Sequence, residues 1–149
     1  MVRGKVMDDS IWVGQHFQAK EFRCPCCGAN TVSHELVKTL DMVRKKLGTP
    51  IRINSAVRCV AHNKSVGGAV QSYHIPREGI GYAADITFGR IYNKALPLNI
   101  IRLFITATDI LMGKGGIILY PAWVHVDMRH ELECNPYRDV SKFAWPRIS

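Results

Sequence analysis

The sequence has no apolar run long enough to cross a membrane, no internal repeat and no low-complexity tract. The longest apolar candidate, residues 100–112, is interrupted by charged residues and falls short of the roughly 18 residues that a membrane-spanning helix needs. Lys5, Asp8 and Asp9 occupy the positions where the apolar part of a secretion signal would lie, so we expect no signal peptide. The length then predicts a single globular domain over residues 1–149.

Acidic residues are scarce relative to basic ones: 12 Asp and Glu stand against 20 Lys and Arg, which gives a net charge of +8. Such a field attracts nucleic acid, anionic membrane surfaces or the acidic polymers of a bacterial wall. The basic residues are spread along the chain, which favours a solubilising role or attraction of an anionic substrate over a nucleic-acid groove. We expect no nucleic-acid partner, no membrane insertion and a monomer.

Cysteine is present in an odd number, five, which is not typical of a secreted disulfide scaffold and indicates a reducing compartment. The run CPCCG at residues 24–28 contains the C-x-x-C spacing that can begin a structural zinc site. The other two thiols, Cys59 and Cys134, are distant in the sequence. We therefore interpret the cysteines as packing residues with a turn at Gly28, and a second zinc site as the less favoured alternative.

Hydrophobic periodicity predicts two helices. The first begins after Ser33, an N-cap residue, carries apolar residues at helical spacing, and ends at Gly48. The second extends from Pro97 to Met112. Short strands are expected at 51–54, 83–88, 116–120 and 123–128, with an irregular N-terminal segment at 1–30, a loop at 59–81 and an irregular tail at 130–149. Because strands and helices are segregated, the predicted class is α+β, a small, mostly antiparallel sheet flanked by helices.

Three segments carry polar residues that a hydrophobic core would not select, and they contain His74, Asp85 and His125. Alternation along 123–128 places His125 and Asp127 on one strand face and valines on the other. Asp85 lies among apolar residues, where an unpaired carboxylate would cost several kcal/mol. A divalent cation would offset that cost for all three, and two His with one carboxylate plus water is typical of catalytic zinc. Each of the three alone is more often an ordinary core or surface residue.

Several short motifs occur in a characteristic order. They are Phe17…Glu21-Phe22…Cys24…Gly28, Ser55-Ala56-Val57-Arg58, Asn63, Val66-Gly67-Gly68, Ser72-Tyr73-His74, Gly81 to Ile86, Gly115-Gly116 and Tyr120 to Arg129. In combination they resemble the zinc D-Ala-D-Ala carboxypeptidase family, which includes phage L-alanyl-D-glutamate endolysins and shares its fold with the hedgehog signalling domain. The resemblance implies one catalytic zinc, held by His74, Asp85 and His125.

The resemblance also implies roles around the metal. Arg58 matches an arginine that steadies the substrate or the oxyanion, and Ser72 matches a serine of the same pocket. The aromatic residues Tyr73 and Trp123 are candidates for substrate binding because they are close in sequence to the proposed ligands. The chemistry of Arg58 agrees with this role, since a guanidinium beside zinc can pair with a substrate carboxylate or a developing oxyanion.

Two positions depart from the family pattern. The first His and the Asp are usually seven residues apart, whereas His74 and Asp85 are eleven apart, with an insertion within 75–80 that we expect to bulge outward and to shape substrate access. Several members carry a Glu or Asp three residues before the last His, where this chain has Ala122. Asp127 is our candidate for the general base; the alternative is a carboxylate that orients His125 or Arg129.

The implied function is a zinc metallopeptidase that hydrolyses peptidoglycan stem-peptide bonds next to D-amino acids, as a D-Ala-D-Ala carboxypeptidase or a phage-type endolysin endopeptidase. We expect synthesis in the cytoplasm and action on the cell wall after release, as in phage lysis. One alternative is a non-catalytic zinc-binding member that acts as a wall-binding or phage structural module. Another is a small nucleic-acid-binding protein with zinc on its cysteines.

Overall fold

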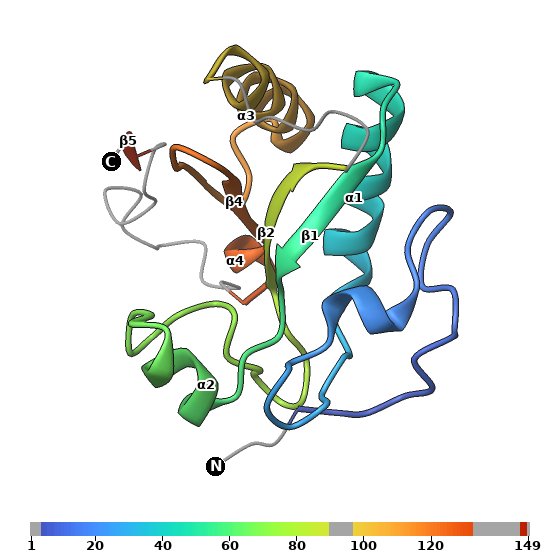
Figure 1. Ribbon diagram of the computed structural model, residues 1–149, viewed down its shortest axis with the longest axis vertical. Helices are drawn as coiled ribbons and strands as arrows, with labels where there is room; N and C mark the ends of the chain where they lie inside the picture. Colours follow the sequence, from blue (N-terminus) through green and yellow to red (C-terminus); the bar gives the residue numbers. More distant parts are fainter. Residues whose placement is uncertain (1–3, 90–96, 133–146, 149) are drawn as a thin grey trace.

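The computed structural model describes residues 4–89, 97–132 and 147–148 (Figure 1). The helices are the 3-10 helix η1 (Ala19–Phe22), α1 (His34–Leu47), α2 (Val60–Ser65), α3 (Pro97–Leu111) and α4 (Arg129–Leu132). The strands are β1 (Ile51–Ser55), β2 (Ala83–Phe88), β3 (Gly116–Leu119), β4 (Val124–Asp127) and β5 (Arg147–Ile148). None of the helices in these ranges is long and apolar enough to span a bilayer.

The strands form one sheet in the order β1-β2-β4-β3-β5. Every neighbouring pair is antiparallel except β3 and β5, which are parallel. The predicted α+β class with a mostly antiparallel sheet is therefore confirmed. The central β2–β4 pair matters most for the site, because its register places Asp85 directly opposite His125.

One face of this sheet builds the hydrophobic core. Val124 and Val126 of β4 are fully buried with Ile86 of β2, in the same cluster as the apolar residues of α1 and α3. Because side chains alternate along a strand, His125 and Asp127 are directed to the opposite face, as the sequence predicts. The apolar face thus anchors the strands and leaves the polar face for the site.

Helix α1 has the predicted caps. The Ser33 hydroxyl accepts a hydrogen bond from the Leu36 amide at 3.2 Å, which satisfies one of the free donors of the first turn. At the other end Gly48 has φ +68°, the left-handed conformation that glycine adopts without strain. The predicted apolar positions of the helix are buried, and they are Leu36, Leu40, Val43 and Leu47.

Three expectations need correction. The predicted loop at 59–81 contains helix α2, which is capped by the Cys59 sulfur accepting from the His62 amide at 3.4 Å; a thiol is a weak capping signal in a sequence. The N-terminal segment includes η1, with Phe17 and Phe22 buried in the core. The tail is not wholly irregular, because α4 begins at Arg129 and β5 pairs with β3.

Candidate metal centre and pocket

The three predicted ligand side chains converge on one point although they are far apart in the chain. His74 comes from the loop before β2, Asp85 from β2 and His125 from β4. His74 Nε2 lies 3.2 Å from Asp85 Oδ1 and 3.2 Å from His125 Nδ1. Asp85 Oδ1 and His125 Nδ1 are 3.0 Å apart. The β2–β4 register accounts for the Asp85–His125 pair, since directly opposed residues on one face of a sheet are neighbours.

The triangle of ligand atoms has the size that zinc requires. Zinc bound to nitrogen or oxygen at about 2.0–2.1 Å in a tetrahedron separates its ligands by roughly 3.3 Å. The observed separations are 3.0 and 3.2 Å. Two His and one carboxylate leave a fourth tetrahedral position, which is the ligand count of a catalytic site.

Hydrogen bonds on the far side of each ring make these atoms acceptors. His74 Nδ1 donates to the carbonyl oxygen of Ala56 at 2.6 Å, which leaves a lone pair on Nε2. His125 Nε2 donates to Asp127 Oδ2 at 2.8 Å, which leaves a lone pair on Nδ1. When His125 is neutral, two lone pairs and a carboxylate oxygen thus face one another. A cation between them removes the repulsion, so the donor set fits a metal ion.

The charges around the cluster are strongly coupled. Burial raises the pKa of the Asp85 carboxyl, but hydrogen bonds from His125 and His74 outweigh it and hold the pKa well below its usual range. Burial lowers the pKa of His125, whereas hydrogen bonds to Asp127 and Asp85 raise it to about 9. The pKa of His74 is lowered, chiefly by burial. Without metal, a proton on His125 takes the place of the cation.

The cluster opens onto a pocket of about 530 Å³, a size usual for small-ligand sites. The lining residues come mainly from the α2–β2 connection and the β3–β4 hairpin. They are Arg58, Val66, Gly67, Gly68, Ala69, Gln71, Ser72, Tyr73, His74, Asp85, Ile118, Tyr120, Trp123, His125 and Arg129. All the predicted ligands and substrate-binding residues are among them.

Arg58 is held in place by three side chains at the edge of the pocket. Its Nη2 donates to Asp85 Oδ2 at 2.8 Å, and its Nε donates to Ser55 Oγ at 2.9 Å. A longer contact joins Nη1 to Asn63 Oδ1 at 3.4 Å. The guanidinium therefore fixes the carboxylate oxygen that faces away from the imidazoles and keeps positive charge at the pocket wall.

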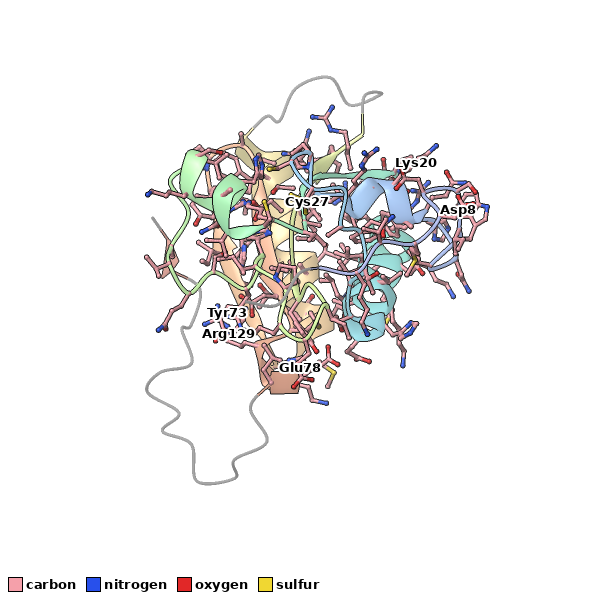
Figure 2. The ribbon with its side chains drawn as sticks, turned by 90° about the horizontal axis from the view of Figure 1, so that it is seen from below. Asp8, Lys20, Cys27, Tyr73, Glu78 and Arg129 are labelled. Atoms are coloured by element: carbon pink, nitrogen blue, oxygen red, sulfur yellow. The ribbon has the colours of Figure 1, made fainter. Side chains whose placement is uncertain are left out.

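Aromatic side chains line two parts of the pocket. Tyr120 and Trp123 are stacked, with ring centroids 4.7 Å apart and an interplanar angle of 17°. The guanidinium carbons of Arg77 and Arg129 lie 4.6 Å and 4.7 Å from the centroid of the Tyr73 ring. Figure 2 shows Arg129 beside Tyr73. Arg129 was not predicted as a pocket residue, although it continues the two-residue spacing of His125 and Asp127.

Asp127 is placed behind the cluster rather than in the pocket. The residue is fully buried and is not among the lining residues. Its Oδ1 accepts from Arg129 Nε at 2.8 Å, and its Oδ2 accepts from Arg129 Nη2 at 2.6 Å and from His125 Nε2. This geometry favours the alternative in which Asp127 orients His125 over the role of general base.

The inserted loop packs against the N-terminal segment, with Pro76 and Gly79 buried. Arg77 and Ile80 form an isolated bridge around Glu78 and Gly79, both with positive φ, and the Gly79 carbonyl accepts from the Lys5 amide at 3.0 Å. No residue of 75–80 is among the described lining residues. Contrary to expectation, the loop therefore does not line the pocket directly. Its link to the pocket is the Arg77 guanidinium, which packs on the ring of the lining residue Tyr73.

The interpretation of the cysteines as unrelated packing residues also needs correction. Cys59, which is distant from the others in the sequence, donates its amide to Cys24 Sγ at 3.4 Å. Cys26 and Cys27 are exposed, so burial does not account for them. Cys134 lies outside the described residues.

Comparison with known proteins agrees with this geometry. The peptidase M15 family matches residues 15–127, a range that includes all three proposed metal ligands. No curated protein matches the chain. Peptidases of this family are zinc-dependent and act on peptidoglycan. Since the match covers well over half of the sequence, the chain belongs to the peptidase M15 family.

Proposed function

We propose that this chain is a zinc peptidase that hydrolyses peptidoglycan stem-peptide bonds next to D-amino acids, as a D-Ala-D-Ala carboxypeptidase or a phage-type endolysin endopeptidase. One observation carries the proposal. His74 Nε2, Asp85 Oδ1 and His125 Nδ1 lie within 3.2 Å of one another at the wall of an open pocket. Release from the cytoplasm during phage lysis is part of the same proposal.

His74, Asp85 and His125 would hold the zinc ion. Bound there, zinc would activate water and polarise the scissile carbonyl. Each ligand has a partner that fixes its orientation: the Ala56 carbonyl for His74, Arg58 for Asp85 and Asp127 for His125. Such partners raise the basicity of the ligands and hold them for the metal.

Arg58 and Arg129 give the pocket its preference for acidic ligands. Both line the pocket, and each is already oriented by a carboxylate, Arg58 by Asp85 and Arg129 by Asp127. The remaining donor capacity of Arg58 suits a substrate carboxylate or the oxyanion that forms during amide hydrolysis. The stacked Tyr120 and Trp123 offer a flat surface for the apolar parts of a peptide.

The second candidate is the non-catalytic member that binds wall peptides without cutting them. Among the described lining residues, Asp85 is the only carboxylate, and it is a proposed metal ligand. A metallopeptidase needs a group that accepts the proton of the attacking water. The lack of a spare carboxylate among these described residues is the observation that supports the binding module as the second candidate.

The deciding experiment is mass spectrometry of a defined muropeptide incubated with zinc-loaded protein, with and without chelator. We expect a metal-dependent product whose mass identifies the cleaved bond. His125→Ala should abolish both metal binding at this site and turnover, whereas His34→Ala, an exposed histidine, should retain both. Zinc-loaded protein that binds the muropeptide without cleaving it would support the binding module. Turnover by His125→Ala would refute the proposed site.

A further inference from the structure

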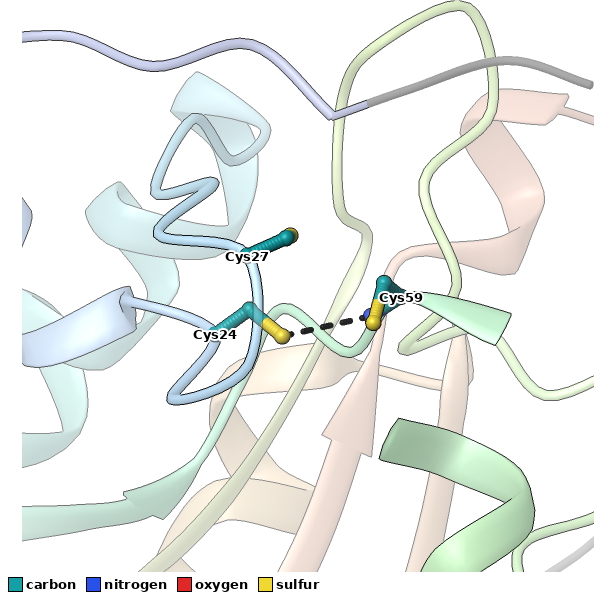
Figure 3. A group of neighbouring side chains, drawn as sticks. All are labelled: Cys24, Cys27 and Cys59. Atoms are coloured by element: carbon teal, nitrogen blue, oxygen red, sulfur yellow. Dashed lines mark hydrogen bonds between the residues drawn. The ribbon is translucent and has the colours of Figure 1, made fainter. Parts of the chain in front are cut away.

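Three cysteines, Cys24, Cys27 and Cys59, form a second cluster. We call these three and the neighbouring Cys26 the thiol cluster. The Sγ atoms of Cys24, Cys27 and Cys59 all lie within 4.8 Å of one another (Figure 3). Cys26 is exposed and adjacent to Cys27 in the chain, and its interaction with Cys59 is the main reason why the pKa of the Cys26 thiol is raised. The cluster joins the loop after η1 to the start of α2, two segments more than thirty residues apart.

The backbone around the thiol cluster directs N–H groups at sulfur. Cys24 Sγ accepts from the Cys59 amide at 3.4 Å, and Cys59 Sγ accepts from the His62 amide at 3.4 Å. Burial raises the pKa of the Cys24 thiol, but the nearby backbone N–H groups of Cys59, Cys27 and Cys26 outweigh it and lower the pKa. Donors of this kind stabilise a thiolate more than a neutral thiol, and such hydrogen bonds to sulfur accompany metal-bound cysteines.

A tight turn holds the first three cysteines in this arrangement. Gly28 has φ +79° and donates its amide to the Cys24 carbonyl at 2.9 Å, which reverses the chain directly after Cys27. A side chain at that φ would be strained, so glycine is required there. The turn brings the sulfur atoms of Cys24 and Cys27 to the same side, facing Cys59.

Ordinary packing does not explain this cluster. Unpaired cysteines that serve as small apolar residues are buried, whereas Cys26 and Cys27 are exposed and Cys59 is only partly buried. Four thiols that share one small volume also repel one another when ionised, and this repulsion contributes to the raised pKa values of Cys26 and Cys27. A divalent cation among them would reverse the sign of that interaction.

We propose that Cys24, Cys26, Cys27 and Cys59 bind a structural zinc ion. Thiolates bound to zinc at about 2.3 Å in a tetrahedron are separated by roughly 3.8 Å. The sulfur atoms of Cys24, Cys27 and Cys59 lie within 4.8 Å of one another, so small side-chain rotations bring them to this spacing, and the exposed Cys26 is the proposed fourth ligand. Four protein ligands leave no position for water, so this site is structural. The ion is additional to the single catalytic zinc that the sequence predicts.

The thiol cluster has a direct connection to the pocket. Cys59 follows Arg58, whose guanidinium donates to Asp85 Oδ2. The Val57 amide donates to the Phe22 carbonyl at 3.1 Å, so the same two segments are also joined by backbone. A metal ion bound by the thiol cluster would hold the start of α2 against the N-terminal segment and so help to position Arg58.

Metal content of the full chain, purified under reducing conditions with added zinc, tests the proposal. We expect two zinc ions per chain in the parent, one in Cys59→Ser and one in His74→Ala. Serine is itself a favoured N-cap residue, so Cys59→Ser keeps the cap of α2 while removing a thiolate. Val60→Ser, at an exposed neighbouring position, is the matched control and should retain both ions.

Cobalt substitution identifies the ligands independently of activity. The parent and His74→Ala should show strong sulfur-to-cobalt charge-transfer absorption, and Cys59→Ser should lose it. If Cys59→Ser does not fold, a mercurial reagent added to the parent provides the same information, because it should release one zinc per chain and leave the other. Unchanged metal content in Cys59→Ser, no thiolate absorption in the parent, or release of no zinc by the mercurial would overturn the proposal.

The same data separate this proposal from the proposed function. If His74→Ala loses no metal while Cys59→Ser loses one, the thiol site stands and the catalytic assignment fails. If His74→Ala loses one ion and Cys59→Ser loses none, the catalytic assignment stands and the thiol site fails.

Discussion

The His74–Asp85–His125 cluster and the thiol cluster each gather metal-binding atoms from distant parts of the chain, but different structures support them. Two of the three ligands of the first lie on adjacent strands, with the sheet core behind them and a pocket in front. All members of the thiol cluster lie in loops or at a helix start. Rigid strands with one open side suit a site where a reaction takes place, whereas loops that need a cross-link suit a closed, structural site.

The two clusters also differ in what replaces the metal when it is absent. In the first, a proton on His125 can lie between the imidazole and Asp85, so the charges stay balanced. In the thiol cluster, protonated sulfurs make only weak hydrogen bonds. Metal removal should therefore abolish activity at the first site with little unfolding, and reduce stability at the second with a smaller effect on activity.

The largest expected effect is the loss of catalysis in His125→Ala. The variant lacks one of three ligands, so zinc binding at this site and hydrolysis should both fall below detection. The thiol-bound zinc should remain, and it is measured as one metal ion per chain. His34→Ala is the control. Measurable turnover in His125→Ala would show that the His74–Asp85–His125 cluster is not the catalytic site.

The next effect is on stability, in Cys59→Ser. Structural zinc contributes directly to folding free energy, so the midpoint of thermal unfolding should fall in Cys59→Ser and should not fall in Val60→Ser. Hydrolysis by the folded fraction should decrease only in part, through a less well-held Arg58. Thermal melts of the zinc-loaded proteins measure the difference. A variant with unchanged melting and no activity would mean that the thiol cluster serves the chemistry rather than the fold.

A smaller effect is expected from Asp127→Asn. Groups that orient a metal ligand are worth about 10–100-fold in metal affinity or activity, and Asn leaves the Arg129 guanidinium without its carboxylate. Zinc titration and the rate of muropeptide hydrolysis should both show this loss. Asp109→Asn, at an exposed ion pair with Lys46, should change neither. Complete loss of turnover with unchanged zinc affinity would instead indicate that Asp127 is the general base.

The most gradual expected effect is a pH dependence of zinc binding at the His74–Asp85–His125 cluster. Zinc must displace the Nδ1 proton of His125, whose pKa is about 9 without metal, so affinity should rise about tenfold per pH unit and level off above pH 9. The usual pKa of histidine is about 6.5. The stability that this proton adds to the metal-free fold is therefore complete below pH 6.5 and lost as the pH rises through 9.

Competition with a coloured chelator at several pH values measures the affinity, and melts of metal-free protein measure the stability. His34→Ala should show the same profiles as the parent. A zinc affinity at the His74–Asp85–His125 cluster that does not change with pH would contradict the coupling between His125 and its carboxylates.

Strand alternation, a local property, supported His125 and Asp85 as candidate ligands, whereas His74 lies in a loop and completed the set through the family resemblance. Apolar Val124 and Val126 required the intervening His125 to face away from the core, and Asp85 stood out as a carboxylate among buried residues. A zinc site on the cysteines was the less favoured alternative for the opposite reason. Its C-x-x-C run is local, but its partner Cys59 is joined to it only by tertiary contact.

The two roles considered for Asp127 could not be separated by pattern either. Alternation places it on the same face as His125, which is compatible with both a base and an orienting carboxylate. The choice depends on Arg129 occupying both carboxylate oxygens and on the complete burial of Asp127, which are facts of packing.

The order of residues along the chain determined the α+β class, the caps of α1 and which strand positions are polar, because these depend on interactions between near neighbours. The folded chain alone decided that His74 meets Asp85 and His125, that Cys59 meets Cys24, and that the inserted loop packs on the N-terminal segment. Contacts between segments tens of residues apart follow from strand register and loop path, and no local pattern encodes either.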